Sequence, residues 1–485
     1  MARPQGGYIG KTPTWSASAR PGVWTLREQQ ELQAQGLWPI LFNNIDNAFG
    51  WNQSADTYAW YPYNGSTSFQ ALAGNEDYID LDVQSRMRRC VINGSTGAVN
   101  YYLDADDSTK KAGDWLRIVE RQTISTFYTG NTFTETASGS LRSGASAWAA
   151  GTYSKGARVT HNGSLWECLA TTTTATPAAG TVAATLTGGD GMVMVEIPLF
   201  STRHSLVSNV HVFQVKLGNV STNGYAPHPA FLKADGSYRP HLYLGGYQGT
   251  GGTTSGALTS VSGANNVVSA TRATFRTAAS GRGSGWHQLG YYEMAAAQYL
   301  MISEFQTMNT QKVLGNGAME GNVYVVATGL SNSRGNRSGN QYTSGGSNSD
   351  YMSYRGLENI YGRAWQWADG FNANSTSVYL ASRYSHWADD TATNYTLVGT
   401  IASGSGSYQT ALLDLNGVCL PSTASGGSPT TFIGDGLWTS TGWRVAYVGG
   451  NAGGGSLDGA FCLTAYVASS DAYSSVGGRL AYGVA

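Results

Sequence analysis

The chain of 485 residues is short of charged side chains, histidine and cysteine. Charged residues make up 12% of it, where soluble proteins average about a quarter, and the formal net charge is −1. Because there is no basic excess, a broad surface for nucleic-acid phosphates is not expected. The four cysteines are far apart and form no CxxC pair, so neither a structural zinc site nor a disulfide framework is indicated.

Long hydrophobic runs are also missing. No run of about 18 apolar residues occurs, so membrane insertion is not expected. Residues 1–10 lack the apolar segment of an ordinary secretion signal. A neutral chain rich in Ser, Thr, Gly and Tyr without such a signal suits a protein that acts outside a cell after release by lysis, as the parts of virions do.

Glycine and aromatic residues are abundant instead. The sequence contains 64 Gly, 14 Trp, 29 Tyr and 13 Phe. This amount of Trp and Tyr supplies ample core, so a disordered chain is not expected despite the glycine. The length favours about three domains.

Short β-prone runs predict strands in the N-terminal half. Tyr78–Val83 alternates between apolar and polar residues, and Gly97–Leu103 and Met192–Phe200 are two further predicted strands. Thr25 to Glu28 has the pattern of a capping box and predicts a helix that ends near Gly36. Together these patterns predict a β-rich α+β protein of several domains.

Two further segments carry apolar residues at helical spacing, Gly290–Thr310 and Gly356–Asp369, and both are predicted to be helices. A Gly/Ser/Thr-rich stretch covers Gly249–Gly285, and short strands and turns are predicted after Phe371. The composition of Gln122–Thr187 shifts to Thr, Ser, Ala and Gly, which indicates a small module inserted into a surface loop. Two short strands joined by an Asn-Gly hairpin turn at residues 162–163 fit this module.

The sequence carries no recognisable catalytic motif: no nucleophile elbow, HExxH, P-loop or Rossmann fingerprint is present. Asp104–Asp107 and Asp389–Asp390 fit a glycosidase carboxylate pair or a Ca²⁺ loop, but solvated turns are favoured. His228 and His241 are interpreted as structural or surface residues rather than a metal pair. No catalytic residue, metal or cofactor is therefore predicted, and a binding protein is the default interpretation.

Four stretches of the sequence resemble phage tail proteins with a C-type-lectin-like C-terminal domain. Their fold is similar to that of formylglycine-generating enzymes and of the variable proteins of diversity-generating retroelements. The stretches are Gly6–Gly10 with Gly22–Leu26; Tyr101–Lys111 joined across the insert to Gly188–Pro198; Tyr354–Phe371; and Trp443–Gly450 with Gly459–Phe461, Ala468–Ser470 and Gly477–Leu480.

The fourth stretch resembles the frame of a retroelement variable region. Strands anchored by Trp443, Phe461 and Arg479 would present changeable side chains on one exposed face. The resemblance implies receptor-binding roles for Ala452, Gly453, Gly454, Leu457, Cys462, Thr464, Tyr466, Val467, Asp471, Tyr473 and Ser475. The alternative is a Gly-rich β-tail of a lectin-like fold without diversification. Cys419 and Cys462 do not reproduce the reactive cysteines of the enzyme relatives, so oxidase activity is not implied.

The insert, from Ser146 to about Thr181, resembles small chitin- or cellulose-binding modules. Trp148, Tyr153 and Trp166 stand at matching places and are candidates for stacking on sugars. Ala170 and Thr171 occupy the usual position of the aromatic platform, so the resemblance implies the fold more strongly than the sugar activity.

The resemblance divides the chain into four units. A virion-anchor segment covers residues 1–40, a β-rich domain covers 41–121 and 186–205, the inserted module covers 122–185 with its carbohydrate-binding-like part at 146–181, and a lectin-like receptor-binding domain covers 206–485.

The implied function is a tail adhesin located in the virion tail or tail fibre. Its implied partners are a host-cell surface receptor, either protein or glycan, and other tail proteins through the N-terminus; the chain is expected to form a homotrimer. Two alternatives stay open. A tail-borne glycan-degrading enzyme would need two acids about 5 Å or about 6.5–9.5 Å apart. A passive collar or decoration protein would need no receptor site.

The diversification hypothesis predicts a feature of the genome. The DNA downstream of the gene should contain a near-copy of the segment that encodes Trp443–Leu480, differing only at adenines and followed by a reverse transcriptase gene. Sequencing that DNA tests the prediction. If neither is present, the list of variable positions loses its main support, whereas the lectin-like fold does not depend on it.

Overall fold

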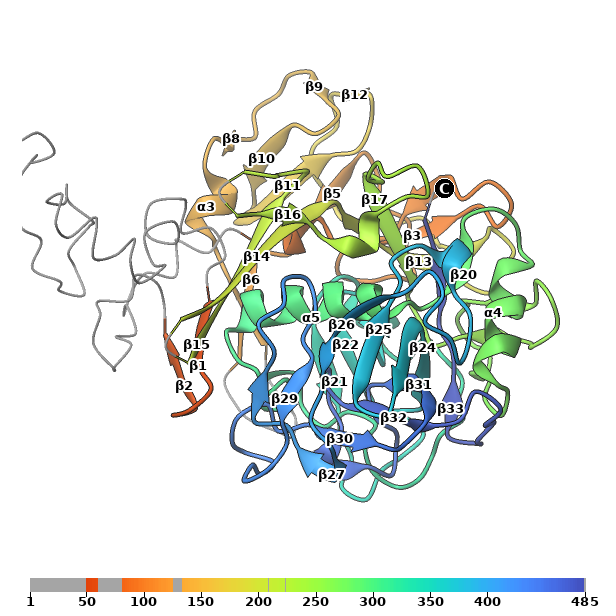
Figure 1. Ribbon diagram of the computed structural model, residues 1–485. Coiled ribbons are helices and arrows are strands. Elements are labelled where there is room, and N and C mark those ends of the chain that lie inside the picture. Colours follow the sequence, from red (N-terminus) through yellow and green to blue (C-terminus); the bar gives the residue numbers. More distant parts are fainter. Residues whose placement is uncertain (1–48, 60–80, 125–132, 208, 223, 484–485) are drawn as a thin grey trace, which may run out of the picture.

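The computed structural model describes residues 49–59, 81–124, 133–207, 209–222 and 224–483, and strands dominate it (Figure 1). The protein is a β-rich α+β fold built from several sheets, as predicted. The predicted N-terminal anchor and its helix after Thr25 lie outside the described residues. So do residues 78–80 of the first predicted strand, and the rest of that segment is a turn that leads into the 3-10 helix η2 (Gln84–Arg86).

A six-stranded sheet joins distant parts of the chain. Its strands, in spatial order, are β20 (Trp286–Gln288), β34 (Leu480–Tyr482), β17 (His241–Gly245), β13 (Met192–Pro198), β3 (Arg88–Ile92) and β4 (Val99–Tyr102). Every residue of β13 and β3 is buried, as expected for strands covered on both faces. This sheet confirms two predicted strands, and it places the units predicted at 41–121 with 186–205 and at 206–485 in one body.

An eight-stranded sheet forms the other large layer. Along its path lie β26 (Thr396–Thr400), β25 (Ser377–Leu380), β24 (Trp365–Asn374), β31 (Trp443–Val448), β32 (Leu463–Val467), β30 (Gly436–Thr439) and β27 (Ser405–Tyr408), and β33 (Val476–Gly477) pairs with β24. A register shift between Ala368 and Asn372 bends β24 against β31. The short strands predicted after Phe371 are therefore confirmed.

The helix predicted over residues 356–369 is wrong. This segment forms β23 (Leu357–Glu358), turns and the first half of β24. Arg355, Gly356, Asn359 and Gly362 have φ values of 43°, 89°, 47° and 101°, and a right-handed helix cannot continue through such residues. The segment is buried on all sides, so its apolar residues satisfy helical spacing without forming a helix.

The second predicted helix is confirmed as α5 (Tyr291–Phe305). The Glu293 carboxylate accepts a hydrogen bond from the Gly290 N–H at 2.8 Å, which closes the first turn. Nearly every residue of α5 is buried because the helix lies between β15 and β24, one strand from each of two sheets (Figure 1). It is the central helix of the core.

A five-stranded sheet covers the side of α5 away from the eight-stranded sheet. Its order is β16 (Ala226–Pro227), β14 (Phe200–Val207), β15 (Val210–Leu217), β1 (Phe49–Asn52) and β2 (Thr57–Ala59). A second helix, α4 (Arg272–Ser280), lies in the Gly/Ser/Thr-rich stretch, where none was predicted. Its signal was local, since the Thr271 hydroxyl caps it by accepting from the Thr274 N–H.

The smaller elements complete the described fold. They are β6 (Arg121–Ile124), β7 (Phe133–Thr136), α3 (Gly139–Arg142), η3 (Pro229–Phe231), β18 (Thr250–Gly251), β19 (Leu258–Thr259), α6 (Gln311–Leu314), η4 (Asn332–Arg334), β21 (Gly339–Gln341), β22 (Tyr351–Tyr354), η5 (Tyr384–His386), β28 (Ala411–Leu412), β29 (Pro421–Thr423) and η6 (Gly455–Leu457).

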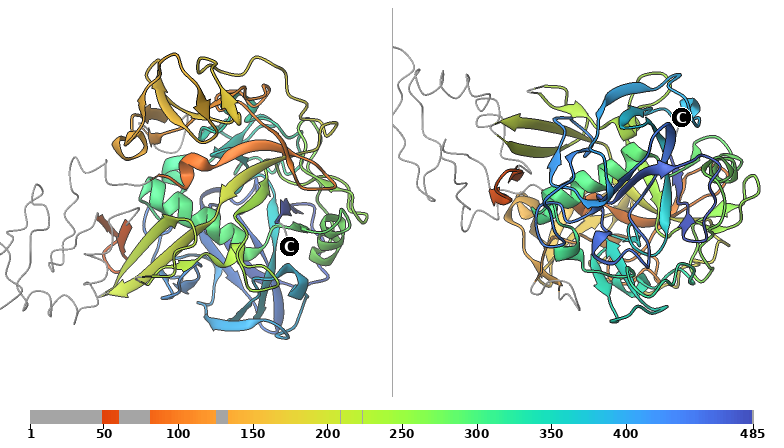
Figure 2. Two further views of the ribbon diagram at one scale, coloured as in Figure 1. Left: turned by 90° about the horizontal axis from the view of Figure 1, so that it is seen from above. Right: turned by 60° about the horizontal axis from the view of Figure 1, so that its bottom comes forward.

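The inserted module forms two small sheets, and one of them includes β5 (Trp115–Arg117), which lies before the predicted start of the insert at residue 122. This sheet has the order β5, β11 (Ser164–Cys168), β10 (Arg158–His161) and β8 (Ser146–Ala147), and the other pairs β12 (Thr172–Thr173) with β9 (Tyr153–Ser154). Asn162 and Gly163 have φ values of 48° and 76° in the turn between β10 and β11, which confirms the predicted hairpin. The module lies at the opposite end of the molecule from β27 and β30 (Figure 1), and in the view from above its gold strands stand at one edge of the molecule (Figure 2).

Fully buried arginines hold the loop-rich parts of the fold together. They are Arg89, Arg272, Arg355, Arg363 and Arg479. Arg479 donates to the Gly245, Glu358 and Asn359 carbonyls at 2.5, 2.7 and 2.8 Å. It also donates to the Gln366 side chain at 2.6 Å. Burial lowers the pKa of Arg479 to about 9, which leaves the guanidinium charged at neutral pH.

Arg355 has the same role at the centre of the molecule. Its guanidinium pairs with Glu304 of α5 at 2.6 Å and donates to the carbonyls of Gln84, Val119 and Glu120 at 3.0–3.1 Å. The Arg355 side chain therefore joins the central helix to two segments that lie more than 200 residues before Arg355 in the chain.

We expect Arg479→Lys to lower the free energy of unfolding by about 3 kcal/mol, because an ammonium group cannot serve acceptors on four residues at once. The control is Arg444→Lys, since Arg444 is half-buried and donates to a neighbouring carbonyl and a serine hydroxyl. Its expected effect is within about 0.5 kcal/mol. Denaturant unfolding measures both, and equal losses would contradict the role assigned to Arg479.

Candidate functional site

A cavity of about 340 Å³ opens beside the eight-stranded sheet, and we call it the aromatic cavity. It is lined by Tyr324, Trp365, Trp438, Tyr447, Asn451, Gly453, Gly454, Asp458, Thr464 and Tyr466. Half of these residues are aromatic, and the cavity is the candidate functional site.

The strand register brings the walls of the aromatic cavity together. Thr464 of β32 is paired with Trp438 of β30 on one side and Tyr447 of β31 on the other, so the three side chains share one face of the sheet. Tyr466 lies two residues further along β32 and has the same orientation. Trp365, at the start of β24, packs edge-to-face on Trp438 at 5.8 Å and lies 4.7 Å from Tyr447 between ring centroids.

A glycine-rich loop closes one side of the aromatic cavity around Asp458. The Asp458 carboxylate accepts a hydrogen bond from the Asn451 N–H at 3.0 Å. A Cβ atom at Gly450 or Gly454 would lie 1.9 or 2.1 Å from an Asp458 carboxylate oxygen, so only glycine fits at these two positions. The loop is then fixed by a second one, because Asn322 donates its N–H to the Ala452 carbonyl.

The carboxylates behind the cavity have no cationic partner among their hydrogen-bond donors. Asp458 accepts from the Asn451 N–H, and Asp435 accepts from the Phe461 N–H at 2.7 Å and the Gln311 amide at 3.3 Å. Burial raises the pKa of both groups well above the usual range of an aspartate. None of the described residues that line the cavity is Lys or Arg, so the wall is neutral to negative.

Five of the positions with predicted receptor-binding roles lie in or beside the aromatic cavity. Gly453, Gly454, Thr464 and Tyr466 line it. Tyr473 lies near the cavity: desolvation and Asp471 raise its pKa, and Tyr466 is close enough to add to the rise. Tyr466 and Tyr473 are 56% and 46% exposed, which is rare for large aromatic side chains in this protein.

The other predicted positions have little or no access to the surface. Ala452, Cys462 and Val467 are at most 2% exposed and belong to the interior. The remaining three are half-buried: Leu457, Asp471 and Ser475. The alternation of fixed and variable positions in the sequence did not reveal which face of each strand points inward.

The aromatic walls are not among the predicted site residues. Trp365 lies in the segment predicted as a helix, Tyr447 lies in the predicted fixed frame, and Trp438 and Tyr324 belong to no predicted site. A signal existed for Trp438 and Tyr447, because large aromatics are dense between residues 438 and 447. Tyr324 had none, since it reaches the site from a separate loop.

The aromatic residues predicted to bind sugar in the inserted module pack against one another and their neighbours. Trp166 is 7% exposed, and its indole N–H donates to the His161 carbonyl at 3.2 Å. Tyr153 packs edge-on against Trp115 at 5.2 Å, and Trp148 against the His161 ring at 5.4 Å. Trp166 therefore belongs to the core of the module, and Trp148 and Tyr153 are half-buried and pack against that core.

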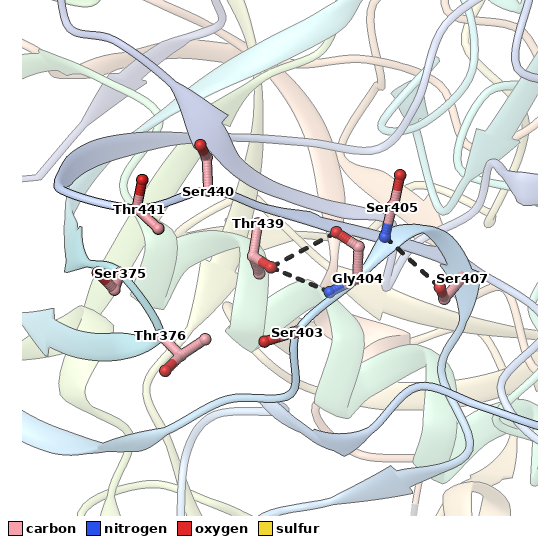
Figure 3. A pocket seen from close by; sticks show the side chains of 9 residues that line it. All are labelled: Ser375, Thr376, Ser403, Gly404, Ser405, Ser407, Thr439, Ser440 and Thr441. Carbon is pink, nitrogen blue, oxygen red and sulfur yellow. Dashed lines mark hydrogen bonds between the residues drawn. The ribbon is translucent and has the colours of Figure 1, made fainter.

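A second hollow, of about 530 Å³, is lined almost entirely by hydroxyl groups (Figure 3). Its residues are Ser375, Thr376, Ser403, Gly404, Ser405, Ser407, Thr439, Ser440 and Thr441. We call this hollow the hydroxyl groove. The strand β30 borders both hollows, because Trp438 lines the aromatic cavity and the next residue, Thr439, lines the hydroxyl groove. The Thr439 hydroxyl bonds to the Gly404 backbone.

The acidic turns and histidines considered as catalytic or metal groups are engaged elsewhere. Asp389 pairs with Arg272 and Arg276 at 2.6 Å, and Asp104 accepts from two N–H groups of its own turn. His228 is buried, which lowers its pKa to about 3, and its ring nitrogen caps η3. Within the described residues, no group of three or more His, Cys, Asp or Glu side chains is arranged to hold a metal.

Comparison with known proteins adds no identification. No protein-family profile matches the chain, and a search of curated proteins found no match. In the described part of the chain, no helix is both long and apolar enough to cross a membrane. The function is therefore argued from the geometry of the aromatic cavity.

The buried carboxylate behind the cavity gives a pH-dependent prediction. The folded-state pKa of Asp435 is raised, so the wild-type protein loses stability as pH rises from about 4 towards that pKa. Asp435→Asn removes this loss. We expect the stability of the variant relative to wild type to increase by at least about 1 kcal/mol between pH 4 and pH 7.

Asp414→Asn is the matched control, because its hydrogen bond with His204 lowers the Asp414 pKa and reverses the sign. Its stability relative to wild type should fall as pH rises from the lowered Asp414 pKa to about 4 and should stay level above that range. Denaturant unfolding at several pH values measures both trends. A pH-independent difference for Asp435→Asn would show that Asp435 has an ordinary pKa.

Proposed function

We propose that this protein is a phage tail adhesin that binds a host-cell surface receptor through the aromatic cavity. The observation that carries the proposal is the pair of exposed tyrosines, Tyr466 and Tyr473, beside a cavity walled by Trp365, Trp438 and Tyr447. Buried or half-buried aromatic anchors beside exposed rigid ones are the usual centre of a recognition surface.

The resemblance to retroelement variable proteins supports the same site. That resemblance assigns ligand contacts to Gly453, Gly454, Thr464, Tyr466 and Tyr473, which lie in or beside the cavity. In a tail-borne homotrimer, several copies would convert a modest affinity into firm attachment.

The cavity favours binding over glycan hydrolysis. Glycoside hydrolysis needs two carboxylates that flank the scissile bond. Among the described residues that line the aromatic cavity, Asp458 alone is acidic, and its side chain is fully buried. A surface that recognises a ligand and leaves it intact is the function that this arrangement supports best.

Point variants test the proposal better than truncation, because β30 to β34 belong to two large sheets and their removal would unfold the protein. We expect Tyr466→Ser to reduce binding of the purified protein to host cells at least tenfold. Leu397→Ser is the control, since Leu397 is equally exposed, at 56%, but lies on β26 at the far edge of the sheet.

Cell binding by both variants is compared with that of wild type by flow cytometry of labelled protein. Loss with Tyr466→Ser and retention with Leu397→Ser is the expected pattern. Undiminished binding by both variants would show that the receptor site lies outside the aromatic cavity. Absence of binding by the wild-type protein would instead favour a passive collar or decoration role.

A further inference from the structure

The walls of the aromatic cavity present ring faces and edges in several orientations. The Trp365 and Trp438 rings meet at 86° and the Trp365 and Tyr447 rings at 53°, and all three rings line the same cavity. Tyr324 and Tyr466 add two further aromatic groups at the opening. Aromatic ring faces carry partial negative charge, and several of them around one space attract a cation.

Two carboxyl groups, Asp458 and Asp435, lie at and behind the walls, and burial raises the pKa of both. Asp458 lines the cavity, and Asp435 lies close enough to add to the rise of the Asp458 pKa after burial itself. The hydrogen bonds to both carboxylates come from neutral donors. Burial without a counter-ion makes ionisation of Asp458 costly, and a cation in the cavity would offset that cost.

The lining also disfavours the other common ligands of aromatic sites. A phosphate or carboxylate would meet no Lys or Arg among the described residues of the lining. A sugar ring would need several polar groups for its hydroxyls. Apart from Asp458 and the aromatic residues, the described lining offers two polar side chains, those of Asn451 and Thr464. A rounded cation with an apolar surface could contact the ring faces and also interact favourably with the buried acid.

We propose that the aromatic cavity binds an organic ammonium group with methyl substituents, of the kind carried by choline, against the rings of Trp365, Trp438 and Tyr447. This inference rests on the proposed function, since it names the receptor chemistry that the same site recognises. The source of the group is either a membrane lipid headgroup or a polymer or small molecule that carries the same group.

The test uses the full-length protein and two probes of the same shape. Choline carries the charge, and 3,3-dimethylbutan-1-ol is its neutral analogue. Binding is followed by tryptophan fluorescence, because Trp365 and Trp438 line the cavity, and by calorimetry. We expect saturable choline binding that is at least tenfold tighter than binding of the neutral analogue.

Variants assign the binding to individual groups. Trp438→Leu should weaken choline binding at least tenfold, whereas Trp443→Leu should leave it unchanged, because Trp443 is also half-buried but contacts Tyr379 outside the cavity. Asp458→Asn keeps an acceptor for the Asn451 N–H and removes the charge, so its effect should be a loss of three- to tenfold. Tyr466→Ser, at the exposed rim, provides a second wall variant that does not disturb the core.

Several outcomes overturn the inference: no binding of choline, equal binding of the neutral analogue, or tighter binding of methyl glycosides than of choline. Co-sedimentation with phosphatidylcholine vesicles that Tyr466→Ser abolishes would support a lipid source, and choline binding without co-sedimentation would support a polymer or small molecule. If the protein adheres to host cells and choline does not compete, this inference fails and the adhesin proposal stands. If choline binds but host cells do not, the adhesin proposal fails instead.

Discussion

The structure depends on buried guanidinium groups that satisfy the carbonyl oxygens of its loops. Much of the described chain is turns and short strands, and buried carbonyls outside sheets need donors. Arg479, Arg355 and Arg89 supply them: each is fully buried and donates to backbone carbonyls or side-chain oxygens of segments far away in the sequence. A planar group with five N–H donors serves several loops at once, which a lysine or a hydroxyl cannot do.

The same interaction shapes the candidate site. The Arg363 guanidinium donates to the Val323 carbonyl, next to Tyr324, and the Arg363 carbonyl accepts from the Ala452 N–H. One residue thus fixes both loops at the opening of the aromatic cavity. The floor is made by strand register, which aligns Trp438 and Tyr447 with Thr464. The site therefore combines a rigid sheet face with loops held by buried charge, and this arrangement pre-organises it for a ligand.

Local signals in the sequence predicted several strands, a helix and a turn, but they did not predict which residues meet in the aromatic cavity. The apolar run of Met192–Pro198, the helical spacing in Gly290–Thr310 and the Asn162–Gly163 turn each act over a short stretch, and each prediction is confirmed. The segment 356–369 misled because complete burial imitates helical spacing. The walls of the cavity come from β24, β30, β31 and a separate loop, and their meeting is set by pairings between distant strands that no local pattern encodes.

The six-stranded sheet also determines how the protein folds. Its strand β34 lies beside β17 and β20, and the Tyr482 hydroxyl donates to the Thr96 carbonyl across 386 residues of sequence. Contacts of such long range close late, since the loop entropy has to be overcome before any of them forms. We therefore expect slow folding in which the inserted module, with contacts of short range, acquires its structure first. The body that holds the aromatic cavity forms later, and until β34 docks, the facing edges of β17 and β20 stay unpaired, which makes this stage the one at which a chaperone would matter most.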